Sequence, residues 1–312
     1  MESFLVCFRA VAPLFFIMAL GYLAQRTGIV PRESVPKLNK IGFRFFIPFT
    51  LFYNIYTSDT SHAIQPKLLL FSLFAVLGEY ALAVVYVLLT EKDPEKQGVK
   101  IQGIYRSNFV LVGLPLASAL VEGADLGPVA LMVVIIVPLF NALAVITLEV
   151  FHGKKPDLGR VLLNIAKNPL IVGSAVGLVF LLTHLRLPVV LESTIRQISP
   201  VSNVYMIFLL GAFFRIGGLG RYRKDLIQVT LGRLVVLPGL FLTIAYLLGI
   251  RGVGFAGMIG VLGSATAVGS FTMTQEMGGD SELAGDIVVI TSLLCIFTLF
   301  GWSFLFKTLG AF

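Results

Sequence analysis

Residues 107–115 read Ser-Asn-Phe-Val-Leu-Val-Gly-Leu-Pro, in the middle of an apolar stretch long enough to cross a lipid bilayer. Pro115 lacks a backbone N–H, its ring clashes with the preceding helical turn, and it favours extended backbone at Leu114. Gly113 permits backbone angles that other residues avoid, and Asn108 can hydrogen-bond a freed peptide group or a solute. The segment therefore predicts either a membrane helix broken near its middle or an ordinary proline kink.

A second weak point lies half a chain length further on, where residues 263–270 read Gly-Ser-Ala-Thr-Ala-Val-Gly-Ser. The apolar stretch before it carries a glycine at every third position, which is typical of close helix packing. Packing explains these glycines better than it explains the hydroxyl groups that follow, so the segment is also a candidate break with polar groups at its centre. The residues concerned are Gly254, Gly257, Gly260 and Gly263, followed by Ser264, Thr266, Ser270 and Thr272.

The two weak points coincide when the chain is shifted by 156 residues, half its length. The shift aligns Asn108 with Ser264, Gly113 with Gly269, Pro13 with Pro169 and Gly21 with Gly177. Each half contains five apolar stretches, and because five is odd, a second copy must enter the bilayer inverted. The sequence therefore predicts one all-α membrane domain, residues 1–312, in which residues 1–156 and 157–312 form two inverted five-helix repeats. The predicted spans are residues 4–24, 40–57, 67–89, 102–121, 129–151, 168–185, 200–217, 226–249, 253–275 and 285–308.

The composition excludes a soluble protein. Hydrophobic residues make up 57% of the chain and charged residues 13%, whereas a soluble globular protein has about 25% charged residues. The net charge of +7 comes from basic residues concentrated in alternate loops, which predicts membrane topology rather than nucleic-acid binding and places both termini outside the cytoplasm, with the chain in the cell membrane. Two cysteines inside predicted spans and three histidines without ligand spacing indicate neither a disulfide framework nor a metal site. No catalytic motif indicates an enzyme.

Charged and amide side chains within the predicted spans are further candidates. Glu79 lies near the middle of the third span, where it is a proton-coupling group, a partner of a basic residue, or a neutral side chain bonded to a neighbouring helix. Arg106 either attracts an anion to the candidate break or anchors its helix at the cytoplasmic interface. Asn141 is either a ligand contact or a hydrogen-bonding group between helices. Arg233 lies nearer a span end, where snorkelling to the interface is the default expectation.

At these positions the chain resembles the auxin efflux carrier family over its whole length. The resemblance rests on the order and spacing of short motifs, namely Gly21-Tyr22, Phe45-Phe46-Ile47-Pro48, Arg106-Ser107-Asn108 followed by Gly113-Leu114-Pro115, Asn168-Pro169 and Gly278-Gly279-Asp280. It implies ten spans in two inverted five-helix repeats, similar to bile-acid/sodium symporters, with the fourth and ninth helices broken and crossing at mid-membrane. The crossover positions would be Asn108 to Pro115 and Ser264 to Ser270, although the ninth span lacks the proline that many members have there.

The function that this resemblance implies is secondary transport of a small organic anion, such as a mono- or dicarboxylate, by alternating access. Auxin itself is not supported, because the Asn-Pro-Asn type of crossover is absent. The alternatives are a channel-like facilitator and a solute-binding sensor of the same fold. Expected partners are the anion and the lipid bilayer; no cofactor is expected, while coupling to Na⁺ or H⁺ and a homodimer stay open. The candidate substrate-binding residues are Asn108, Gly113, Pro115, Ser264, Thr266, Gly269 and Thr272, and the candidates for coupling or charge are Glu79, Arg106 and Asn141.

Overall fold

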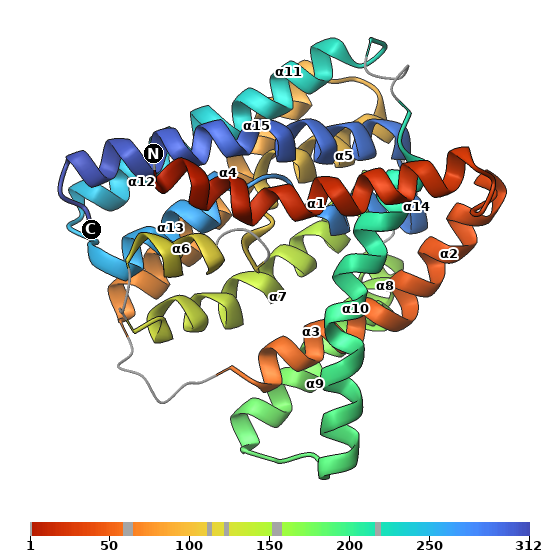
Figure 1. Ribbon diagram of the computed structural model, residues 1–312, viewed down its shortest axis with the longest axis horizontal. Coiled ribbons are helices and arrows are strands. Elements are labelled where there is room, and N and C mark those ends of the chain that lie inside the picture. The colour runs from red at the N-terminus through yellow and green to blue at the C-terminus, as the bar shows by residue number, and fades with distance from the viewer. Residues whose placement is uncertain (1, 59–64, 111–113, 122–124, 152–157, 216–219) are drawn as a thin grey trace.

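A computed structural model of the chain describes residues 2–58, 65–110, 114–121, 125–151, 158–215 and 220–312. Within these ranges every regular element is helical, and extended backbone pairs at one isolated bridge (Figure 1). The predicted all-α class is therefore confirmed for the described part of the chain. In order, the elements are α1 (Glu2–Arg26), η1 (Arg32–Ser34), α2 (Val35–Ile41), η2 (Gly42–Phe46), α3 (Ile47–Tyr56), α4 (Pro66–Thr90), α5 (Pro94–Tyr105), α6 (Leu114–Leu120), α7 (Gly127–Val150), α8 (Leu158–Lys167), α9 (Pro169–Thr183), α10 (Val189–Phe213), α11 (Arg223–Leu231), η5 (Gly232–Val236), α12 (Leu237–Leu247), α13 (Gly252–Gly263), α14 (Val268–Met277) and α15 (Ser281–Thr308).

Four helical segments are long and apolar enough to cross a bilayer. They are α4, α7, the continuous run of α11, η5 and α12, and α15, with 24 to 28 residues each. A helix of about 20 residues already spans the hydrocarbon core. The apolar helices α9 and α13 are shorter, at 15 and 12 residues. The structure is thus that of a multi-pass membrane protein, and the full count of ten spans stays a prediction.

The most extensive helix–helix contacts are those of α1 with α10 and of α3 with α9. In Figure 1, α3, α9 and the N-terminal part of α10 project away from the other helices. Glycines allow the helices of each pair to approach closely. A Cβ atom on Gly211 of α10 would run into the carbonyl group of Met18 in α1, and one on Gly177 of α9 would lie 2.9 Å from the carbonyl oxygen of Phe52 in α3. Both contacts involve backbone, so the helix axes are held at a distance that only glycine permits.

Replacing Gly211 by alanine is expected to destabilise the protein by about 1–3 kcal/mol, because the added methyl group forces α1 and α10 apart. The higher helix propensity of alanine offsets about 1 kcal/mol of this loss. Thermal unfolding of the purified protein measures the change. The matched control is Gly301→Ala in α15, where no heavy atom lies within 4 Å of the added Cβ. Equal melting temperatures for the two variants would contradict the close packing of α1 on α10.

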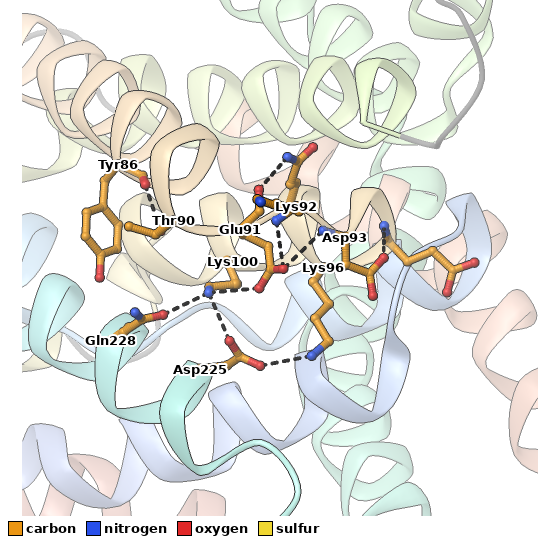
Figure 2. A network of polar contacts seen from close by, with 11 residues as sticks. Tyr86, Thr90, Glu91, Lys92, Asp93, Lys96, Lys100, Asp225 and Gln228 are labelled. Atoms are coloured by element: carbon orange, nitrogen blue, oxygen red, sulfur yellow. Dashed lines mark hydrogen bonds and ion pairs between the residues drawn. The ribbon is translucent and has the colours of Figure 1, made fainter.

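A buried lysine joins α5 to α11 (Figure 2). The Nζ atom of Lys100 donates to Asp225 Oδ1 at 2.9 Å, Gln228 Oε1 at 2.9 Å and Glu91 Oε2 at 3.1 Å, and Lys96 Nζ lies 3.2 Å from Asp225 Oδ2. Burial acts to raise the pKa of the Glu91 carboxyl, but hydrogen bonds from the Asp93 amide and from Lys100 outweigh it and hold the pKa below its usual value. The network ties the start of the interrupted helix α5 to the long span beside it.

Lys96 and Lys100 lie before residue 102, the predicted start of the fourth span, but within a helix rather than in a loop. Helix α5 begins at Pro94, where proline is favoured in the first turn, and the carboxylate of Asp93 accepts the N–H of Glu95 at 3.1 Å. Both lysines therefore lie on the helix. Because both lysines are charged, the hydropathy of the sequence predicts that they lie outside a span. Their carboxylate partners neutralise these charges.

Candidate functional site

Two helices are interrupted in or beside the segments where the sequence predicts a break. Helix α5 ends at Tyr105, and Arg106 has extended backbone angles of φ −85° and ψ 112°. Helix α13 ends at Gly263, residues 264–267 are non-helical, and α14 begins at Val268. The second interruption forms without a proline in the break itself.

The two interruptions meet, and each satisfies backbone groups of the other. Ser107 and Thr266 form an antiparallel bridge. The N–H of Asn108 donates to the carbonyl of Ala265 at 2.8 Å, and the N–H of Ala267 donates to the carbonyl of Arg106 at 3.1 Å. Because a lipid bilayer offers no partners for freed peptide groups, irregular backbone at this depth persists only where the protein supplies them. This mutual pairing explains why the second break needs no proline.

The Thr266 side chain completes the junction rather than facing a solute. Its hydroxyl donates to the carbonyl of Gly103 in the last turn of α5 at 2.7 Å, and its N–H donates to Thr291 Oγ1 at 3.2 Å. Ser264 and Thr272 are also buried, and their hydroxyl groups have no partner among the described residues. None of these three residues lines the cavity described below. Their predicted role as substrate contacts therefore lacks support from the geometry.

A buried arginine donates hydrogen bonds to the C-terminal ends of both interrupted helices. Arg233, in η5, is fully buried and forms an ion pair with Glu79 of α4. The prediction that Arg233 snorkels to the interface is wrong, because the carboxylate and several carbonyl groups hold it inside the protein. The distances are 2.9 Å from Nε to Ser264 O, 2.9 Å from Nη2 to Val261 O, 3.0 Å from Nη1 to Tyr105 O, 3.5 Å from Nη1 to Ile104 O and 3.3 Å from Nη1 to Glu79 Oε2.

A cavity of about 130 Å³ lies beside the junction and is called the crossover cavity here. It is bounded by the two interruptions, by α7, and by α3 and α10 of the projecting group. Its size suits a small solute, since a cavity of about 150 Å³ admits benzene. The candidate residues that it brings together are Arg106, Asn108, Asn141 and Gly269. The polar lining residues outside the candidate list are Thr50, Asn54, Ser107, Ser202 and Asn203.

Arg106 supplies the positive charge of the crossover cavity. It is 6% exposed, so the alternative of an anchor at the cytoplasmic interface is wrong. Its Nη2 atom donates to Asn141 Oδ1 at 2.7 Å, and its Nη1 atom contacts Gln102 Oε1 at 3.2 Å and Met273 Sδ at 2.9 Å. All these partners are neutral, and no carboxylate of the described residues forms an ion pair with it. A buried guanidinium without a carboxylate partner is suited to an anionic ligand.

Asn108 also lines this cavity. Its side-chain nitrogen is buried and has no hydrogen-bond partner among the described residues. Buried donors without a partner are rare in folded proteins and point to a missing water, ion or ligand. Of the remaining predicted residues, Gly113 lies outside the described residues and Pro115 is in the first turn of α6.

A larger cavity of about 450 Å³ lies where the C-terminal ends of α1 and α10 approach the N-terminal end of α15. It is called the mixed-charge cavity here, because both signs of charge line it. Arg215 and Glu282 pair at 3.8 Å across it, so part of its positive charge is already neutralised. No predicted site residue lines it; its charged residues are Arg26, Arg32, Arg215, Glu282 and Asp286.

The sequence profile of a family described as Membrane transport protein matches residues 6–160 and 154–303. The chain belongs to this family. The predicted kinship with carriers is thereby confirmed. A solved structure with a similar fold is the sodium proton antiporter MjNhaP1 from Methanocaldococcus jannaschii at pH 8, with 13% identity, 96% of this chain and 97% of that chain covered, and a TM-score of 0.47. A search of curated protein sequences gives no significant match.

Proposed function

We propose that this protein is a secondary carrier, not an enzyme, and that it moves a small mono- or dicarboxylate across the cell membrane by alternating access. The observation that carries the proposal is the buried guanidinium of Arg106, which faces the crossover cavity without a carboxylate partner among the described residues. Asn108 lines the same cavity, and its buried amide nitrogen has no partner among the described residues. Together they offer a carboxylate a charge-assisted contact and a neutral donor.

The arrangement of helices supports the inverted repeats on which alternating access depends. A shift of 156 residues carries α1 onto α9 and α3 onto the second half of α10. The pair of α1 with α10 therefore corresponds to the pair of α9 with α3, as a two-fold axis between the halves requires. The same shift brings the end of α5 near the end of α13. We therefore retain ten spans in two inverted repeats, with both termini outside the cytoplasm, as part of the proposal.

The position of the crossover cavity suggests which parts move. Its walls come from α3 and α10 on one side and from the two interruptions on the other. A solute held there contacts both groups of helices at once. We infer that α1, α3, α9 and α10 stay in place while the helices that carry the interruptions rock or slide past them.

Counterflow in proteoliposomes tests the proposal. Vesicles loaded with unlabelled malate or malonate are expected to accumulate the radiolabelled acid saturably. Asn108→Ala is expected to lower the rate by about 10-fold or more, because a hydrogen bond to a charged ligand is lost. The matched control is Asn164→Ala, an exposed asparagine bonded to Glu149 far along the chain from the cavity. Equal rates for wild type and Asn108→Ala would remove the assigned site, and large single-channel currents would indicate a channel instead.

Gly269→Ala is expected to weaken transport while the fold persists. A Cβ atom at this position would lie 3.2 Å from Nη2 of Arg106, so the guanidinium would have to shift away from Asn141. Counterflow rates and melting temperature are measured together. Gly98→Ala in α5 is the control, because its Cβ would meet Leu148 at an ordinary distance of 3.4 Å. Similar transport by both variants would show that Arg106 tolerates displacement and does not set the site.

A further inference from the structure

The C-terminal ends of the two interrupted helices converge on one point. The last carbonyl groups of a helix lack intrahelical partners and carry the negative end of the helix dipole. Here the carbonyl groups of Tyr105 in α5 and of Val261 and Ser264 at the end of α13 all accept from Arg233, at 2.9–3.0 Å. These ends would repel one another without a positive charge between them.

In carriers with broken helices, such C-terminal ends and unwound carbonyl groups commonly coordinate a coupling cation. In this protein the guanidinium of Arg233 already occupies that place. Its Nε, Nη1 and Nη2 atoms all donate to the converging groups. The carboxylate that would serve a metal cation, Glu79, lies 3.3 Å from the same guanidinium, and both side chains are fully buried.

We propose that Arg233 is a tethered cation that replaces a bound metal cation at the crossover, so that the junction assembles without Na⁺. For the carrier proposed above, and resting on that function, it follows that anion transport is independent of a sodium gradient. Glu79 then balances the charge of Arg233 and is not a sodium ligand. The guanidinium is a positioning group, since it holds the two interruptions together and does not line the crossover cavity.

Three measurements on the full-length purified protein test this assignment. The first is the melting temperature in sodium chloride against choline chloride at equal ionic strength. A cation present at about 100 times its Kd raises the melting temperature of a protein of this size by about 4 °C, whereas we expect no difference for the wild type. The second is direct binding of radioactive ²²Na⁺ to the wild type, where we expect no saturable binding. The third is malate counterflow with and without sodium, where we expect equal rates.

Variants separate a tethered cation from a merely structural side chain. Arg233→Ala leaves the Glu79 carboxylate and the carbonyl groups facing a vacated space, so its melting temperature is expected to fall and to be partly restored by millimolar guanidinium or by Na⁺. Arg233→Lys keeps the charge and is expected to restore more stability than Arg233→Gln. This ranking keeps the test informative if the alanine variant does not fold.

Saturable ²²Na⁺ binding to the wild type that Glu79→Gln abolishes would overturn the proposal, as would a sodium-dependent melting temperature of the wild type. Equal stability of Arg233→Lys and Arg233→Gln would also overturn it. Absence of malate counterflow from the wild type would count against the proposed function alone, because the stability and ²²Na⁺ results do not depend on the transported anion.

Discussion

Arg106→Ala is expected to reduce anion counterflow by about 30-fold or more. Removing one partner of a buried, hydrogen-bonded charge pair costs about 2–5 kcal/mol, and 2 kcal/mol already corresponds to about 30-fold in affinity. In this cavity Arg106 is the side chain that can meet a carboxylate with two parallel N–H groups. Its position is fixed by Asn141, Gln102 and Met273, so the charge is preorganised before the anion arrives.

Two further variants make the Arg106 result specific. Arg106→Lys keeps the charge but loses the planar fork, so an intermediate rate is expected. Arg196→Ala removes an exposed arginine and is expected to transport like the wild type. The melting temperature of each variant is measured alongside, because Arg106→Ala also leaves Asn141 Oδ1 without its donor. A folded Arg106→Ala protein with wild-type rates would refute the role of this guanidinium.

Replacing one residue of the Arg233–Glu79 pair is expected to cause a large loss of stability. Arg233→Met is expected to destabilise the protein by about 3–5 kcal/mol, since it leaves a buried carboxylate without its counter-charge. Glu79→Gln is expected to have the same sign, because it leaves the guanidinium unbalanced. In the double variant the uncompensated charge is absent, so its loss of stability is expected to be smaller than the sum of the single losses.

Reversible unfolding of the wild type, the two single variants and the double variant gives the coupling energy of the pair, which we expect to be about 1–3 kcal/mol. The double variant is not expected to regain the stability of the wild type. The carbonyl groups of Tyr105, Val261 and Ser264 lose their donor both in Arg233→Met and in the double variant. The control pair is Lys96 and Glu95, neighbours in sequence near the surface without a bond between their side chains. Losses that simply add for Arg233 and Glu79 would contradict the ion pair.

The interruptions could be predicted from local chemistry. Pro115 and Gly113 weaken one helix, and the hydroxyl-rich segment from Ser264 weakens the other. The structure has a break beside each segment. The mutual pairing of the two breaks could not be derived residue by residue, since it joins Asn108 to Ala265 across more than a hundred positions of the chain.

The sequence predicts a basic partner as one alternative for Glu79 but does not identify it as Arg233. Of the three alternatives for Glu79, the structure shows pairing with a basic group, and a role in proton coupling stays a prediction. A signal was present, since Arg233 follows Glu79 by 154 residues, close to the half-length shift. In inverted repeats, positions of this kind come into contact only where both lie close to the two-fold axis.

The crossover cavity could be predicted only in part. Arg106, Asn108 and Gly269 lie on the interruptions themselves, and sequence reasoning found them. Asn203 lies on a helix of the projecting group, and its place at the cavity depends on how that group packs against the interruptions. Thr266 lies at the junction, where its hydroxyl donates to the carbonyl of Gly103, and its role as a substrate contact stays a prediction. Polar composition locates a break, but packing decides which groups remain free for a ligand.

The most direct test of the central claim is a cryo-electron microscopy structure of the protein in lipid nanodiscs with a transported acid, such as malate, at saturating concentration. We expect density for the anion in the crossover cavity, within hydrogen-bonding distance of the Arg106 guanidinium and the Asn108 amide. Density in the mixed-charge cavity among Arg26, Arg32 and Arg215, with the crossover cavity empty, would contradict it.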